Sequence, residues 1–168
     1  MKNSEPKTRV IIKRIGGYLH KVVTIGDGTG KVLQTVVSPF MVELRPKDIL
    51  QIIVGATILA IPVGLTEEVW ILAQQLKVKN VALLGCLSVL FISLFVYYNF
   101  YRFHLKGNLF NYIKRVAATY GLSLLVVGVL LTIIEKCPWG TDNMLAINRI
   151  IITTFPASMA ATISDTIK

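Results

Sequence analysis

Charged residues are scarce in this 168-residue chain, at 16% of the sequence, against roughly a quarter in ordinary soluble domains. They are also clustered, so that long stretches carry no charge at all, while hydrophobic residues make up 54% of the chain. A soluble domain spreads charge over its whole surface. The scarcity therefore argues against a soluble globular protein, and the length suits one folded unit.

Cysteine and histidine are nearly absent. Cys86 and Cys137 form no CxxC pair, and neither His20 nor His104 stands in a metal-ligand spacing. The sequence also has no nucleophile elbow and no HExxH motif. These absences predict a protein that is not an enzyme and needs no cofactor.

Acidic residues are half as frequent as basic ones, and the net charge is +9. In a soluble protein this excess suggests a nucleic-acid partner. Here no aromatic residues alternate with basic ones on a soluble face, and basic loops retained on the cytoplasmic side of a membrane explain the charge better. We therefore expect membrane lipids as partners and no nucleic acid.

Four long apolar runs dominate the rest of the chain. The shortest uncharged stretches, about 17 residues in the first run and about 15 in the fourth, are near or below the lower limit for a bilayer span. We predict membrane-spanning helices at about 48–76, 80–101, 112–134 and 144–167. These helices form a transmembrane domain over 47–168.

Residues 1–46 have a different pattern, with short β-branched runs separated by glycine-rich turns. They predict a basic, soluble, β-rich segment. Thirteen Lys and Arg residues fall before the first span or in the connection between the second and third spans, against four in the other two connections. This bias predicts a multi-pass protein of the cell membrane with both termini in the cytoplasm. The predicted fold class is an all-α membrane protein of four transmembrane helices with a small β-rich cytoplasmic element.

Acidic residues at membrane depth are the candidates for function, because carboxylates are costly in a bilayer. Glu67 and Glu68 follow Thr66 and a helix break at Pro62 and Gly64, where proline frees backbone carbonyls. Interrupted helices of this kind line ion sites in transporters. We predict Thr66, Glu67 and Glu68 as an ion pathway and the two glutamates as a cation site.

The fourth span repeats this arrangement, with a break at Pro156 and an acid at Asp165 that we also assign to the pathway. Small residues spaced by four precede both acids and predict close helix packing. The predicted packing residues are Ala60, Ala157, Ala161, Gly121 and Gly128.

An interfacial interpretation stays open for these acids. Counting about 1.5 Å per residue from Ile49 places Glu67 nearly 30 Å along the helix, at the edge of the hydrocarbon. Trp70 beside it is typical of an interface anchor. On this interpretation the acids are solvated or paired helix ends.

Two segments, 65–70 (LTEEVW) and 155–165 (FPASMAATISD), together with Arg149, resemble a family of small prokaryotic integral membrane proteins catalogued as a domain of unknown function. The resemblance covers roughly 43–168 and leaves most of the β-rich segment outside. It implies a multi-span membrane protein, with Thr66, Glu67, Glu68, Pro156 and Asp165 as signature positions, and it implies no particular activity.

The sequence therefore favours an oligomeric membrane protein that conducts or transports cations. Four helices enclose little volume, so a homo-oligomer gathering one glutamate per chain into a ring is the expected arrangement. The alternative is a membrane scaffold or sensor whose basic segment binds anionic lipid or a protein partner.

Overall fold

The computed structural model describes residues 7–16, 18–26, 32–39, 43–102 and 108–167. The chain divides into two compact units, Met1–Glu43 and Leu44–Lys168. The division falls three residues before the boundary expected from the sequence.

The first unit contains a three-stranded antiparallel sheet in the order β1-β2-β3, formed by Lys7–Ile15, Tyr18–Gly26 and Val32–Pro39. Gly16 has a φ of +59°, a conformation that glycine adopts without steric cost, where the chain turns from β1 to β2. Val10 pairs with Val23, and Val23 pairs with Val36, across the three strands. The expected β-rich element is confirmed.

Both faces of this sheet carry apolar side chains. Residues paired across antiparallel strands point to the same face, so the Val10–Val23–Val36 row lies on one face and the Ile11–Val22–Val37 row on the other. In both rows, the residue on β1 and the residue on β3 are more than 40% exposed. The sheet thus has exposed apolar side chains on both faces.

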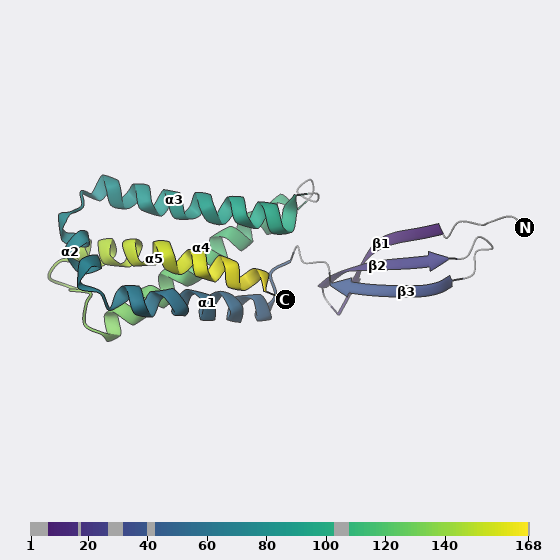
Figure 1. Ribbon diagram of the computed structural model, residues 1–168, viewed down its shortest axis with the longest axis horizontal. Helices are drawn as coiled ribbons and strands as arrows, with labels where there is room; N and C mark the ends of the chain where they lie inside the picture. The colour runs from purple at the N-terminus through teal and green to yellow at the C-terminus, as the bar shows by residue number, and fades with distance from the viewer. Residues whose placement is uncertain (1–6, 17, 27–31, 40–42, 103–107, 168) are drawn as a thin grey trace, which may run out of the picture. The chain divides into compact units, whose positions relative to one another are not determined.

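The second unit is helical (Figure 1). Four of its helices are long and apolar enough to cross a membrane, which confirms the predicted fold class. The elements in chain order are α1 (Pro46–Gly64), α2 (Glu67–Gln75), α3 (Val78–Val96), the π-helical turn η1 (Tyr97–Tyr101) that continues α3, α4 (Leu109–Ile133) and α5 (Asn143–Thr166).

Helix α5 lies at the centre of this unit and contacts each of the other α-helices. In Figure 1 it runs between α1 and α3, and the end of α5 lies beside the start of α1. Small residues allow the close approach of α1 and α5: a Cβ atom added to Gly55 would lie 2.5 Å from the Cβ atom of Ser164. Ala157 and Ala161 are fully buried in the same region.

The first predicted span is divided in the structure. Helix α1 ends at Gly64, and Thr66 has an extended backbone and stands directly before the separate helix α2. The indole Nε1 of Trp70 donates to the Gly64 carbonyl at 3.0 Å, which ties the two helices together at the corner. The 19 residues of α1 extend roughly 28 Å, enough for the hydrocarbon core without α2.

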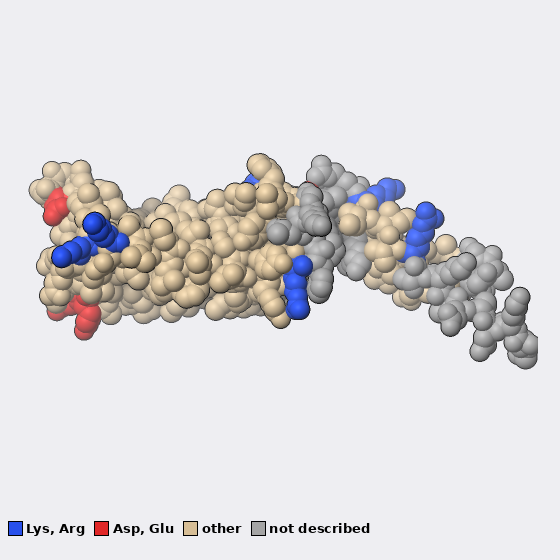
Figure 2. Space-filling model, turned by 90° about the horizontal axis from the view of Figure 1, so that it is seen from above, with Lys and Arg blue, Asp and Glu red and all other residues tan. Residues whose placement is uncertain are grey.

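Charged side chains avoid the flank of the helical unit. On the face that Figure 2 shows, Lys and Arg lie at both ends of the helical unit, Asp and Glu lie at one end, and the surface between them is uncharged. Large apolar side chains in the helices are exposed, among them Ile58, Leu90, Leu94 and Leu125. This distribution is the one that a surrounding bilayer requires.

The residues predicted to pack helices lie in different environments. Ala60, Ala157 and Ala161 are fully buried, whereas Gly121 is exposed and a Cβ atom there would meet nothing within 4 Å. A Cβ atom on Gly128 would make ordinary contact with Ile150, at 3.7 Å. Pro62 lies in the last turn of α1, and Pro156 lies in the middle of α5 without ending it.

Candidate functional site

Three charged side chains meet inside the helical unit, and each comes from a different helix. Arg115 belongs to the second turn of α4, Asp48 to the first turn of α1 and Asp165 to the last turn of α5. Their exposed fractions are 0%, 2% and 1%. We call these three residues the charge cluster.

The guanidinium of Arg115 holds both carboxylates. Its Nε donates to Oδ2 of Asp165 and one terminal nitrogen donates to Oδ1, both at 2.8 Å. The same terminal nitrogen donates to Oδ2 of Asp48 at 3.2 Å. The pair with Asp165 is bidentate, the strongest and most directional contact between these groups.

Aromatic rings enclose the cluster where α3 ends. The Arg115 guanidinium lies 3.9 Å from the centre of the Phe100 ring, a cation–π contact. Tyr101 is fully buried and packs edge-on against Tyr112, with 5.3 Å between ring centres. Both Phe100 and Tyr101 belong to η1, so this turn supplies an apolar wall that keeps water from the charges.

The helix ends explain why the acids occupy these positions. Asp48 accepts a hydrogen bond from the backbone N–H of Arg45 at 3.1 Å and caps the start of α1, where the helix dipole favours an anion. Asp165 lies at the opposite end of a helix, where the dipole disfavours an anion, so Arg115 has to compensate its charge. Gln51 strengthens the junction by donating to the Ile167 carbonyl at 2.6 Å.

The cluster contains two carboxylates and one guanidinium, and Arg45 stands beside it, where its backbone N–H donates to Asp48. Since the guanidinium already occupies the position between the carboxylates, a metal ion would have to displace it.

The structure places the predicted acids at opposite ends of the helical unit. Asp165 joins the charge cluster, whereas Glu67 and Glu68 are exposed in the first turn of α2. The hydroxyl of Thr66 donates to the Val63 carbonyl at 2.7 Å. Within the described residues, no group of three His, Cys, Asp or Glu side chains is arranged to hold a metal ion.

The surroundings of Glu67 and Glu68 fit a membrane interface. Lys136 lies over the Trp70 ring, with its amino nitrogen 4.0 Å from the ring centre. The carbonyl of Lys136 accepts a hydrogen bond from Arg149. The acidic first turn of α2 is also stabilised by its own helix dipole.

Sequence reasoning missed Arg115 and Asp48, because both stand next to a charged neighbour and resemble loop residues. The signal for Arg115 was its spacing: Arg115, Thr119 and Ser123 are four residues apart, which places a polar row on one face of α4. All three are fully buried.

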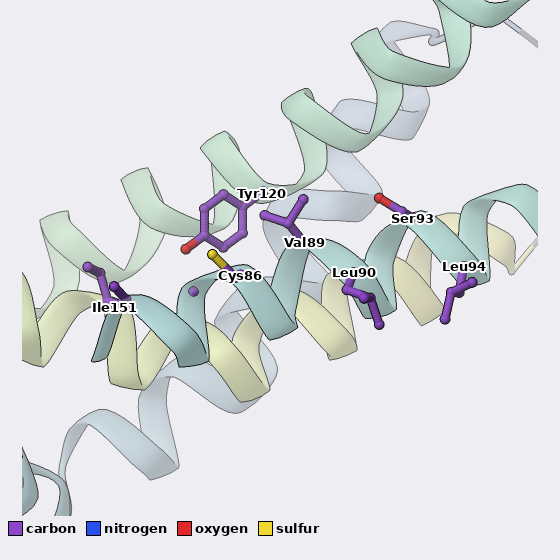
Figure 3. A pocket seen from close by; sticks show the side chains of 9 residues that line it. Cys86, Val89, Leu90, Ser93, Leu94, Tyr120 and Ile151 are labelled. Atoms are coloured by element: carbon purple, nitrogen blue, oxygen red, sulfur yellow. The ribbon is translucent and has the colours of Figure 1, made fainter. Parts of the chain in front are cut away.

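A groove opens between α3 and α4, away from the charge cluster (Figure 3). It has a volume of about 730 Å³ and is lined mainly by apolar side chains of α3, together with Tyr120 of α4 and Ile151 of α5. Its lining includes none of the charge-cluster residues. The groove is therefore a feature of the apolar flank and no part of the charged site.

Four apolar spans around a buried charge cluster define a multi-span integral membrane protein. The chain belongs to the family described as "Putative integral membrane protein (DUF2391)", whose model matches residues 32–165. The match confirms the resemblance carried by the sequence motifs and extends it to strand β3. Searches of curated proteins and of solved structures found no match.

Proposed function

We propose that this protein moves a cation across the membrane and that Asp48, Arg115 and Asp165 form its charge-binding site. The observation that carries the proposal is the burial of two carboxylates and the guanidinium that binds both, each at most 2% exposed, where three spans meet. Ionisable groups inside spans are costly, and they commonly mark ion and proton pathways.

The orientation is part of the proposal. The start of α1 and the end of α5 lie at the same end of the helical unit, as an even number of spans requires (Figure 1). The excess of Lys and Arg at that end favours a cytoplasmic position for both termini. The charge cluster then lies near the cytoplasmic surface of the cell membrane.

A homo-oligomer fits this function, because a ring of subunits adds a pathway that one four-helix unit is too small to enclose. Glu67 and Glu68 project from α2 and would be available to such a ring as a cation-attracting entrance. On this view the glutamates recruit cations at one surface, and the buried cluster controls passage at the other.

The test is cation flux into liposomes that contain the purified protein, with the membrane potential clamped. We expect flux above that of protein-free liposomes, and a loss of at least tenfold in both Asp48→Asn and Asp165→Asn. Glu135→Gln is the matched control, because it removes an exposed carboxylate outside the proposed pathway at nearly constant volume. If the parent protein carries no cation, or both asparagine variants carry cations like the parent, the proposal is wrong.

A second candidate function is a membrane scaffold or sensor. The described strands contain five Lys or Arg residues and no Asp or Glu, which favours contact with anionic lipid headgroups. The exposed apolar rows of the sheet add a surface that inserts among the headgroups. On this reading the protein senses or organises lipid and transports nothing.

A further inference from the structure

A second groove lies along the last turns of α3 and α5, at the end of the helical unit that holds the charge cluster. It has a volume of about 880 Å³, and apolar residues such as Phe91 and Leu94 line it on the α3 side. Helix α5 contributes Met159, Ile163 and Thr162, whose hydroxyl donates to a carbonyl of its own helix. We call this space the α3–α5 groove, and its walls are apolar for most of their length.

The α3–α5 groove runs from the middle of the membrane toward one surface. Phe91 lies near the middle of the 24-residue span Val78–Tyr101, and its ring centre lies 6.3 Å from that of Phe155 on α5. From Phe91 to Tyr98 the helix rises roughly 10 Å. Half of the hydrocarbon core is roughly 15 Å thick. The groove therefore covers most of the depth of a single leaflet, as one acyl chain does.

At the membrane surface the groove ends beside a positive charge. Tyr97, Tyr98 and Asn99 line this end, and Tyr98 is 63% exposed. One terminal nitrogen of Arg102 donates to the Tyr98 hydroxyl at 3.1 Å, and the guanidinium lies 4.9 Å from the centre of the Tyr98 ring. Arg102 itself is exposed. Tyr98 therefore positions a cation at the open end of an apolar groove.

The π-helical turn η1 shapes this end of the groove. The side-chain amide of Asn99 donates to the Phe95 carbonyl at 2.8 Å, which ties η1 to the last turns of α3. Such turns are rare and frequently occur at functional sites. The residues of η1 divide between two surroundings: Tyr97 and Tyr98 line the groove, whereas Tyr101 is fully buried on the side of the charge cluster. The groove and the charge cluster therefore share one structural element.

We propose that the α3–α5 groove binds one anionic phospholipid, with an acyl chain between α3 and α5 and the phosphate beside Arg102. An apolar chain that ends in a negative charge is complementary to an apolar groove that ends in a positive one. The connection at this end, residues 102–114, contains three Lys or Arg residues and no Asp or Glu. Anionic lipids are enriched in the cytoplasmic leaflet, where the proposed orientation places this end. The inference concerns lipid recognition and holds whether or not the protein moves a cation.

The charges favour a lipid over a second copy of this chain in the groove. A copy with the same orientation in the membrane would bring the same end of its own helical unit to Arg102. The acids of the helical unit at that end, Asp48 and Asp165, are at most 2% exposed and bind Arg115. They are therefore not placed to neutralise Arg102 of a neighbour. A zwitterionic lipid would fill the groove but carries no net negative charge, so the groove selects the anionic headgroup.

The experiment titrates the purified full-length protein with phosphatidylglycerol or phosphatidylcholine of the same acyl chains, and native mass spectrometry counts the bound lipid. We expect the parent protein to bind one phosphatidylglycerol about fivefold more tightly than phosphatidylcholine, the factor that one basic residue at an anionic surface gives. Arg102→Gln should abolish this preference, and Arg102→Lys should keep most of it, because an ammonium also binds phosphate. Lys114→Gln is the matched control, because it removes an exposed cation at the same end that does not line the groove.

A second variant tests the groove and leaves the charge in place. Ile163 lines the groove and is 53% exposed, so Ile163→Trp should fill the groove and weaken the binding of both lipids. Leu125→Trp is its control, at an exposed position of α4 outside the groove. Lipid bound at the β-sheet would not respond to Ile163→Trp. If Arg102→Gln does not fold, the comparison of these two tryptophan variants decides the proposal.

Three results would overturn the lipid site. The first is equal affinity of the parent protein for the two lipids. The second is binding of phosphatidylglycerol that Arg102→Gln or Ile163→Trp leaves unchanged. The third is a parent dimer that Ile163→Trp separates into monomers without loss of bound lipid, because a second copy would then cover the groove. A parent protein that carries no cation leaves the lipid site intact, since lipid binding is measured without flux.

Discussion

Arg115 and Asp165 are joined by two hydrogen bonds of 2.8 Å although fifty residues separate them in the chain. The pair fixes the start of α4 to the end of α5, and both side chains are at most 1% exposed. Asp48 adds the start of α1 to the same junction. One guanidinium therefore sets the relative positions of three of the four spans at one end of the bundle.

Replacing Arg115 with Gln should destabilise the protein strongly. The change removes the guanidinium that both buried carboxylates bind, and breaking a buried ion pair in this way costs about 3–5 kcal/mol. Arg115→Lys should cost less but still be harmful, since an ammonium cannot make the bidentate contact with Asp165. The measurement is thermal unfolding in detergent.

Cys137 provides the readout for that measurement in a Cys86→Ser background. Burial hides its thiol and raises its pKa, so the folded protein should react slowly with a thiol-reactive dye and react on unfolding. The double variant Arg115→Gln, Asp165→Asn is the control, because it removes one carboxylate with the guanidinium and should regain part of the stability. Equal midpoints for the parent and Arg115→Gln would show that the cluster does not hold the helices.

The sequence was sufficient to predict four spans and a β-rich segment, because runs of apolar residues and β-branched residues are local signals. It also identified Asp165. It did not identify Arg115 as its partner, since an ion pair between residues fifty apart has no local signal. The division of the first span after Gly64 did have a local signal. Thr66 followed by Glu67 and Glu68 is a typical helix start, and it argues against one continuous helix over the first span.

A methyl group at Gly55 should disrupt the contact between α1 and α5. A Cβ atom there would lie 2.8 Å from the Ala160 carbonyl oxygen and 2.9 Å from the Cα atom of Ala161, and backbone atoms cannot move aside locally. Overpacking of this kind costs about 1–3 kcal/mol. We expect Gly55→Ala to lower the thermal unfolding midpoint in detergent.

Gly121→Ala is the matched control for that substitution. It lies within α4 at an exposed position with nothing within 4 Å of an added Cβ atom. Since alanine is the better helix former, Gly121→Ala should leave the midpoint unchanged or raise it slightly. Similar midpoints for the two variants would mean that α1 and α5 do not approach as closely as the structure indicates.

Single cysteines should report the orientation of the spans in a Cys86→Ser, Cys137→Ser background. Lys77 and Thr141 are exposed in connections at one end of the helical unit, and Asn108 begins α4 at the other end. Because Lys and Arg favour the cytoplasm, we expect an impermeant maleimide outside intact cells to label positions 77 and 141 and to spare position 108. Labelling of position 108 alone would reverse the orientation.

The sheet should respond to the charge of the lipid. On β1, Arg9, Ile11, Lys13 and Ile15 alternate with their neighbours and share one face, where all four are exposed. We expect an environment-sensitive dye on Ile11→Cys, in the full-length cysteine-free background, to shift to the blue in liposomes with anionic lipid. The shift should be absent in neutral liposomes.

The double substitution Arg9→Gln, Lys13→Gln tests whether charge causes the response. Each basic residue near an anionic surface contributes about 1 kcal/mol, so removing two should weaken sheet binding by about 2 kcal/mol and reverse most of the shift. Raising the salt concentration should also weaken binding of the sheet, because exposed charges are screened beyond about 10 Å at 0.1 M salt.

Val32→Gln, on the third strand, is the control for these basic residues. It removes an exposed apolar side chain and no charge, so the variant should retain the dependence on lipid charge. If the dye reports the same environment in neutral and anionic liposomes, the basic residues do not direct the sheet to the membrane surface, and its apolar rows need another partner.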